Sequence, residues 1–82
     1  MAQKNHSASS SQNELNERYL SLSERQKETM KYLILGLSNK EIALKLDISP
    51  RTVEIHRTLV MERMLAKSLA ELVRMGIELK LS

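Results

Sequence analysis

Serines mark the positions at which helices can begin along this chain. An N-cap serine accepts a hydrogen bond from a free backbone N–H of the first helical turn, and Glu or Gln three residues later completes a capping box. The candidate starts are Ser23 with Gln26, Ser38 with Glu41, Ser68 with Glu71, and Ser49 followed by Pro50. Proline is favoured at the first helical position, where its missing N–H costs nothing. These starts predict helices near 24–35, 39–46, 50–65 and 68–80.

Composition and patterning favour an all-α fold. No segment alternates polar and apolar residues with the period of two that is typical of strands. Phe and Trp are absent, and Tyr19 and Tyr32 are the two aromatic residues, so the core must be built from aliphatic residues and Met, which suit helices. Gly36 is expected to end the first helix in the left-handed conformation. We therefore predict one four-helix domain over residues 22–82.

The residues before this domain are mostly polar. Residues 1–13 contain too few apolar side chains to order themselves by burial. Residues 14–20 can form either a short turn of helix or an extended arm that packs Leu15, Tyr19 and Leu20. We predict a flexible N-terminal tail over residues 1–21.

The second and third helix starts lie about a dozen residues apart, as in a helix-turn-helix. The first of the two helices is expected to end at Leu46, and a tight turn runs through Asp47 and Ile48. Residues 38–60 are therefore predicted to form a helix-turn-helix, whose second helix can lie in a DNA major groove. The formal charge of +3 and the pI of about 9.5 are compatible with nucleic-acid binding but do not establish it.

Other functional classes find little support in the sequence. The chain has no cysteine, and His6 and His56 are too far apart for a plausible metal site. No nucleophile–base pair, phosphate loop or carboxylate pair with a pocket is recognisable, so we expect no enzyme activity, no cofactor and no small-molecule ligand. No apolar run approaches membrane-spanning length and no signal core is present. We therefore expect a soluble, cytoplasmic protein without a membrane partner.

A helical wheel separates two faces of the third predicted helix, at about 100° per residue. Val53, Val60 and Met64 form the core side, and the opposite arc contains Arg51, Glu54, Ile55, Thr58 and Glu62. One interpretation is a solvated surface with a single exposed isoleucine. Given the helix-turn-helix spacing, we favour base readout, because Arg can bind guanine, Glu can accept from cytosine, Thr can do either, and Ile can pack on a thymine methyl. The predicted base-contacting residues are Arg51, Glu54, Ile55 and Thr58.

Phosphate contacts are expected beside this face. Thr52 and Arg57 flank it, and free backbone N–H groups at the start of the preceding helix favour an anion. The predicted backbone-contacting residues are Ser38, Asn39, Lys40, Thr52 and Arg57. Lys45, Arg63 and Lys67 are further basic residues, of which Lys45 and Arg63 are expected to be solvated charges. His56 is expected to be partly buried, with a hydrogen bond to one ring nitrogen.

The last predicted helix is more apolar than one core-facing stripe requires. It is either broadly buried or a partner surface, and little of this short chain remains to cover a second face, which favours the partner surface. The residues predicted to form this partner surface, which the resemblance described next implies to be a dimer interface, are Leu69, Leu72, Val73, Met75 and Leu79.

Three stretches resemble the LuxR-type helix-turn-helix domain, and most of all the effector domain of FixJ-type response regulators. They are 22–26, 36–43 and 46–57, and the similarity continues over 67–69 and 72–75. The resemblance covers about residues 22–79. It implies a four-helix DNA-binding domain whose third helix enters the major groove and whose fourth helix, from Ser68 to Leu79, forms the dimer contact. The implied base-facing residues agree with the wheel.

One departure from this family concerns signal sensing. Members carry a receiver or ligand-binding domain before the module, whereas 21 residues precede the resemblance here and no aspartate occurs before Asp47. The chain is therefore expected to be a free-standing module or a fragment of a longer regulator, and the native-looking tail after Met1 slightly favours the former.

The sequence thus predicts a sequence-specific transcriptional regulator that binds an inverted repeat in double-stranded DNA as a homodimer, with RNA polymerase as a further partner to consider. The alternative is a protein-interaction module that pairs with a LuxR-type regulator or RNA polymerase to modulate transcription. The low net charge and Glu54 keep that alternative open. Dimerisation without DNA affinity would distinguish it.

Overall fold

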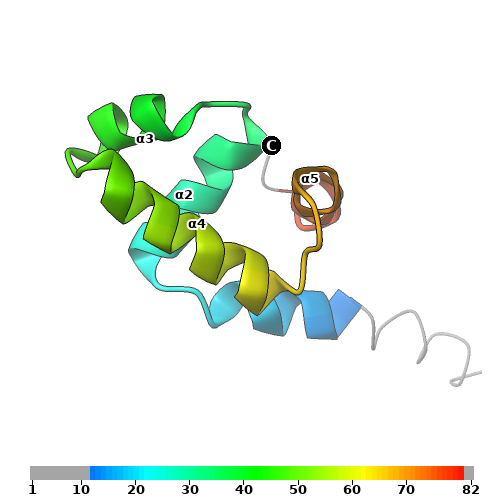
Figure 1. The fold of residues 1–82 in the computed structure, drawn as a ribbon. Helices are drawn as coiled ribbons and strands as arrows, with labels where there is room; N and C mark the ends of the chain where they lie inside the picture. The colour runs from blue at the N-terminus through cyan, green and yellow to red at the C-terminus, as the bar shows by residue number, and fades with distance from the viewer. Residues whose placement is uncertain (1–11, 81–82) are drawn as a thin grey trace, which may run out of the picture.

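The computed structural model describes residues 12–80, which consist of helices joined by short turns (Figure 1). The labelled helices are α2 (Glu24–Ile34), α3 (Asn39–Leu46), α4 (Pro50–Met64) and α5 (Leu69–Glu78). A further helical segment, residues 12–20, precedes them and is called the N-terminal helix below. Strands are absent from the described part of the chain. The all-α fold and the four predicted helices are confirmed, with ends that differ by at most two residues.

The N-terminal helix departs from the predicted flexible tail. Leu15 is only 5% exposed and joins the core. The ring of Tyr19 lies 5.3 Å from Lys27 Nζ of α2, and Gln12 Nε2 donates to the carbonyl oxygen of Glu78 at 3.5 Å. Of the two alternatives for residues 14–20, the structure shows a helix, although Leu20 is exposed. Residues 1–11 of the predicted tail, and residues 81–82 of the predicted domain, lie outside the described residues.

Each labelled helix begins directly after one of the predicted serines. The serine Oγ accepts the backbone N–H three residues on, at 3.1 Å in every case. The capping boxes of Ser23 and Ser38 are complete. The box predicted at Ser68 is wrong, because Glu71 Oε1 accepts the N–H of Lys67 instead, at 2.8 Å. Ser68 has a φ of −153°, against −70° and −77° at Ser23 and Ser38, so its own N–H is turned differently.

A left-handed residue lies at the end of each of the four labelled helices, and at the end of α5 it is Lys80, with a φ of 61°. Gly36 has a φ of +90°, and the N–H groups of Gly36 and Leu37 bond back to the last turn of α2 in a Schellman motif. Helices α3 and α4 end at non-glycine residues, Asp47 and Leu65, both with a φ of 58°. The left-handed Leu65 explains why α4 stops one residue before the predicted end.

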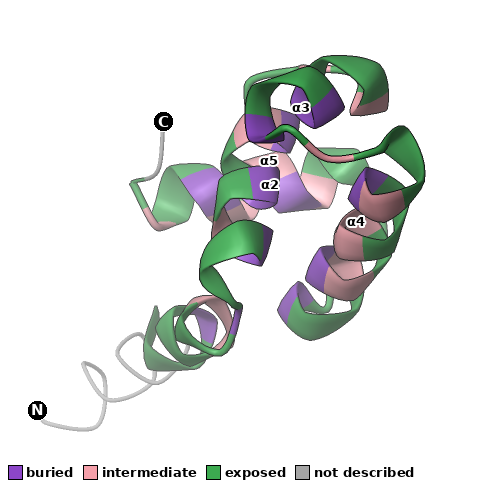
Figure 2. Cartoon of the chain, turned by 90° about the vertical axis from the view of Figure 1, so that its left-hand side faces the viewer, coloured by how far each residue is buried: buried purple, intermediate pink, exposed green. Residues whose placement is uncertain are grey.

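Helix α2 lies centrally and packs on α3, α4 and α5, and α3 also packs on α4. Figure 2 shows the buried positions of these helices turned toward one another. The largest fully buried side chains are Met30, Leu33, Ile42, Met64, Leu72, Val53, Val60 and Thr29. The Thr29 hydroxyl donates to the carbonyl oxygen of Arg25 at 2.9 Å, so it is not left unpaired. The core is therefore aliphatic and methionine-rich, as the composition predicted.

The approach of α5 to α2 depends on a glycine. Gly76 is buried, and a Cβ atom at this position would collide with the side chain of Ile34. The missing methyl group lets the backbone of α5 lie directly against the end of α2. No helix of the described region is long and apolar enough to cross a membrane.

Truncating Leu15 tests whether the N-terminal helix belongs to the folded unit. Leu15→Ala should lower the free energy of unfolding by about 2–3 kcal/mol, because it removes buried methyl groups and leaves a cavity. Leu20→Ala on the same helix, where the side chain is 68% exposed, is the matched control and should cost less than about 0.5 kcal/mol. Urea unfolding followed by circular dichroism measures both. Equally small losses would contradict an integral N-terminal helix.

Candidate nucleic-acid interface

Helix α4 has one buried and one exposed face. Val53, Val60 and Met64 are each 0% exposed, so the predicted core side is confirmed. The four predicted base-contacting residues, Arg51, Glu54, Ile55 and Thr58, are all exposed. The apolar Ile55 remains 53% exposed although it lies in the middle of the helix. The outward face is therefore available for a partner, and its role in base contact stays a prediction.

The start of α3 lies beside this face and carries three of the predicted phosphate-contacting residues. Ser38 and Lys40 are exposed and Asn39 is half-buried. Ser38 Oγ is used to cap the helix, and the carboxylate of Glu41 accepts the N–H of Ser38 at 2.8 Å. Within the described region, the N–H groups of Asn39 and Lys40 remain unbonded donors of the first turn.

A hydrogen bond joins the two helices across this region. Arg57 Nη1 of α4 donates to Asn39 Oδ1 of α3, at 3.4 Å. Both residues line a hollow whose remaining lining residues are Glu54, Thr58, Met61 and Glu62. The two ion pairs of the described region, Arg25–Glu28 and Lys27–Glu24, lie within α2 and do not involve Arg57. The guanidinium of Arg57 is therefore held by a neutral group. Thr52, also predicted to contact phosphate, is half-buried and its hydroxyl lies 2.9 Å from that of Ser49.

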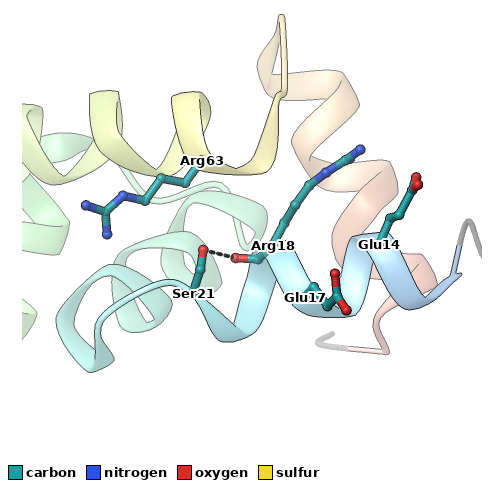
Figure 3. A pocket seen from close by; sticks show the side chains of 5 residues that line it. All are labelled: Glu14, Glu17, Arg18, Ser21 and Arg63. Atoms are coloured by element: carbon teal, nitrogen blue, oxygen red, sulfur yellow. Dashed lines mark hydrogen bonds between the residues drawn. The ribbon is translucent and has the colours of Figure 1, made fainter.

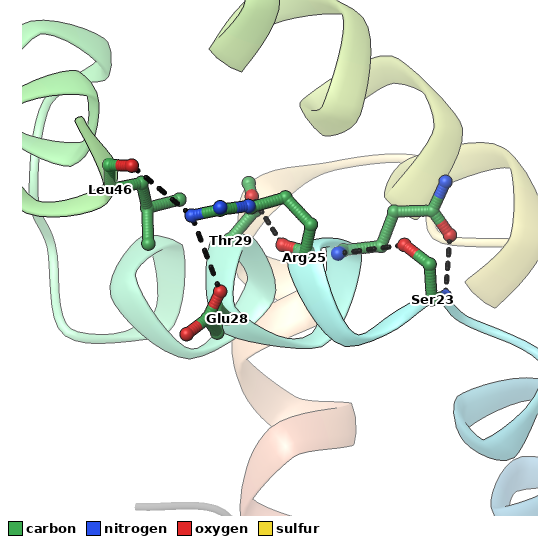
Figure 4. A network of polar contacts seen from close by, with 6 residues as sticks. Ser23, Arg25, Glu28, Thr29 and Leu46 are labelled. Carbon is green, nitrogen blue, oxygen red and sulfur yellow. Dashed lines mark hydrogen bonds and ion pairs between the residues drawn. The ribbon is translucent and has the colours of Figure 1, made fainter. Parts of the chain in front are cut away.

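The turn between α3 and α4 is tied to α2 by an arginine that the sequence did not single out. Figure 4 shows the side chain of Arg25 reaching toward Leu46, with Glu28 beside it. Arg25 Nη1 donates to the carbonyl oxygen of Leu46 at 3.2 Å and lies 3.6 Å from Glu28 Oε1. A cation is favoured at this helix end by the helix dipole. Arg25 and Leu46 lie 21 residues apart, so no local pattern could have predicted the contact.

Arg63 is exposed, as expected of a solvated charge, but its guanidinium also makes a contact between helices. Its Nη1 donates to Gln26 Oε1 at 3.0 Å, the same oxygen that accepts the N–H of Ser23. Arg63 also lines a shallow hollow beside the N-terminal helix (Figure 3), together with Glu14, Glu17, Arg18 and Ser21. It therefore joins α4 to the start of α2. Lys45 is exposed, as expected of a solvated charge, and Lys67 is exposed as well.

His56 is half-buried, as predicted, but its expected hydrogen bond is not formed. The Nδ1 atom is buried and has no hydrogen-bond partner among the described residues.

Helix α5 exposes less apolar surface than predicted. Leu72, which was assigned to the dimer interface, is 0% exposed and belongs to the core of its own chain, so it offers no exposed surface to a partner in this conformation. Helix α5 packs on α2, and Gly76 is buried on the same helix. Met75 and Leu79 are half-buried against the core as well.

The apolar surface that remains on α5 forms one line. Leu69 is 39% and Ile77 61% exposed, and the half-buried Val73 lies between them at helical spacing. We call Leu69, Val73 and Ile77 the α5 stripe. The N-terminal helix lies against a different side of α5, where Arg74, Met75 and Glu78 line a hollow with Leu15 and its neighbours. The N-terminal helix therefore leaves the stripe uncovered.

Known proteins with similar sequences are bacterial regulators. Residues 20–76 match the family described as "Bacterial regulatory proteins, luxR family". The chain is 52% identical over 65 residues to the transcriptional regulatory protein FixJ of Rhizobium meliloti. The aligned residues make up 79% of this chain and 32% of FixJ. It is 45% identical over 67 residues to the response regulator TodT of Pseudomonas putida. Here the aligned residues make up 82% of this chain and 30% of TodT. The chain spans about a third of the length of these curated relatives.

Solved structures show the same arrangement of helices. The C-terminal transcriptional activator domain of FixJ from Sinorhizobium meliloti superposes with a TM-score of 0.71 at 52% identity, over 80% of this chain and 84% of that domain. The response regulator StyR gives a TM-score of 0.89 at 33% identity, over 92% of this chain and 38% of StyR. The likeness therefore includes the helix-turn-helix and the helices that support it.

The left-handed residue in the helix-turn-helix offers a stability test. Asp47→Val should lower the free energy of unfolding by about 2 kcal/mol, because a β-branched side chain is strained at positive φ. Asp47→Gly removes the same carboxylate without that strain and should change stability by less than about 1 kcal/mol. Asp47 is exposed, so neither change loses core packing. Thermal unfolding compares the two variants, and an Asp47→Val protein as stable as Asp47→Gly would contradict the strained turn.

Proposed function

Because the chain belongs to the luxR family of bacterial regulatory proteins and carries its DNA-binding, transcription-regulating domain, we propose a specific DNA target for it. The proposed target is an inverted repeat in double-stranded DNA, which the chain binds as a homodimer. The observation that carries the proposal is the orientation of α4. Its inner face is fully buried and its outer face presents Arg51, Glu54, Ile55 and Thr58. Such a helix can enter the major groove with these side chains toward the base edges.

Sequence readout is assigned to the chemistry of those four side chains. Arg51 can donate twice to guanine, Glu54 can accept from a cytosine amino group, and Thr58 can do either. Ile55 can pack on the methyl group of thymine, and this contact would remove from water an apolar side chain that is exposed in the free protein. Glu54 also repels phosphate, so its presence on this face supports selectivity more than unspecific affinity.

Phosphate contacts are assigned to the start of α3 and to Arg57. An anion is favoured at a helix N-terminus. The N-terminus of α3 offers four groups to a phosphate: the unbonded N–H groups of Asn39 and Lys40, the Lys40 ammonium and the hydroxyl of Ser38. Thr52 and Arg57 lie beside the reading face on α4. Contacts of this kind set the position of a protein on the duplex without reading its sequence.

Dimerisation is assigned to the α5 stripe. Leu69, Val73 and Ile77 replace the broader set expected from the sequence, because Leu72 lies inside the core and Met75 and Leu79 pack against it. A two-fold contact between two copies would bury this exposed apolar line and set two α4 helices against one inverted repeat.

Selection from a pool of random duplexes with the purified chain, followed by salt-titrated fluorescence anisotropy, tests the proposal as a whole. An enriched inverted repeat is the expected result. Binding that falls steeply with salt but enriches no sequence would replace specific readout by unspecific phosphate affinity. Absence of binding would favour a protein-interaction module that modulates another regulator or RNA polymerase.

Single substitutions should separate base readout from phosphate contact. Arg51→Ala should relax preference at one base pair at a cost of about 1–3 kcal/mol for a lost bidentate contact, and Thr58→Ala should relax preference at another through loss of a single hydrogen bond. Lys40→Ala should weaken cognate and scrambled duplexes alike and reduce the slope of log K against log salt by about 0.9. Lys45→Ala, which removes the same charge at the far end of α3, is the control and should change neither quantity substantially. Equal losses on both duplexes for every variant would contradict the assignments.

A charge in the α5 stripe should prevent dimerisation. Ile77→Glu places a carboxylate where two stripes would meet, so the dimer should weaken at least about tenfold because the charge loses its water. Leu44→Glu, at an apolar position that is 80% exposed but lies outside the stripe, is the matched control. Analytical ultracentrifugation with and without the selected duplex measures the association. A dimer that tolerates Ile77→Glu as well as Leu44→Glu would exclude the stripe as the interface.

A further inference from the structure

The bond between Asn39 and Arg57 links two residues that the sequence analysis treated as separate phosphate contacts. Arg57 Nη1 lies 3.4 Å from Asn39 Oδ1, and the two residues are 18 positions apart on different helices of the helix-turn-helix. Both side chains are half-buried. The amide of Asn39 is therefore already engaged with another side chain of the same face.

The chemistry of the two groups suits a positioning role. A guanidinium has five N–H donors in a fixed plane, so one bond to Asn39 leaves donors for a bidentate contact with phosphate. An amide oxygen is neutral and cannot cancel the charge of Arg57, whereas a carboxylate in its place would compete with phosphate. Glu54 and Glu62 line the same hollow, yet neither forms an ion pair with Arg57 in the described region.

We propose that Asn39 is a positioning residue, which holds the guanidinium of Arg57 in the orientation that binds a DNA phosphate. The inference rests on the proposed function. A free arginine side chain loses rotamer entropy when it is fixed, and the bond to Asn39 removes part of that loss before DNA arrives. Because the bond spans α3 and α4, the orientation of Arg57 also depends on how the two helices are set against each other.

A double-mutant cycle in DNA affinity tests this role, with the enriched duplex as the probe and Asn39→Ala, Arg57→Ala and the double variant as the proteins. Asn39→Ala should weaken binding about 3- to 10-fold when Arg57 is present, which corresponds to one neutral hydrogen bond. It should weaken binding less than about 2-fold when Arg57 is already Ala. Two additive losses would show that Asn39 contacts DNA independently and would overturn the inference.

Nuclear magnetic resonance of the free protein supplies a readout that loss of stability alone would not change. The {1H}-15N NOE of Arg57 Nε should fall in Asn39→Ala while the backbone amides of α4 keep their values. Asn39→Asp retains the acceptor and should keep the NOE high, but its negative charge should weaken DNA binding below that of Asn39→Ala. An unchanged NOE in Asn39→Ala would overturn the inference.

The same experiments separate this inference from the function on which it depends. A wild-type chain that binds no duplex would refute both. A chain that binds its selected duplex but gives an additive cycle would refute the positioning role alone and leave the regulator assignment intact.

Discussion

The burial of the inner face of α4 is the contact on which the rest of the molecule depends. The labelled helices have 8 to 15 residues, and helices of this length are marginal in isolation, so packing rather than propensity holds them. Val53, Val60 and Met64 direct one side of α4 into α2 and α3. Because these apolar residues all lie on one side, the opposite side is free to carry polar groups without any cost to the core.

Helix α2 supports that contact through polar bonds to the turn of the helix-turn-helix and to the end of α4. Arg25 reaches the last carbonyl of α3, and Gln26 receives the guanidinium of Arg63 from the far end of α4. The buried Gln26 also closes the capping box of its own helix. One short segment at the start of α2 therefore fixes the turn of the helix-turn-helix and the end of α4, and α2 supports both helices as a scaffold.

Local hydrogen bonds explain what could be predicted from the sequence, and distant contacts explain what could not. Each serine cap joins residues three apart, so the pattern alone predicted where the helices begin, and helical periodicity predicted the two faces of α4. The burial of Leu72 depends instead on the packing of helices that are distant in the sequence, since Gly76 of α5 lies against Ile34 of α2, 42 residues away. Two further features likewise arise only after the helices have packed. They are the hydrogen bonds of Arg25, Arg57 and Arg63, and the burial of Leu15.

The arrangement of the two aromatic rings has an optical consequence. Tyr19 of the N-terminal helix lies against Lys27, and the ring of Tyr32 lies 5.8 Å from Lys31 Nζ, so both rings pair with lysines of α2. With no Trp or Phe in the sequence, near-ultraviolet absorption and intrinsic fluorescence come from these two rings. Detachment of the N-terminal helix changes the surroundings of Tyr19 alone, whereas complete unfolding changes those of both. The chain thus carries its own spectroscopic reporter for detachment of the N-terminal helix.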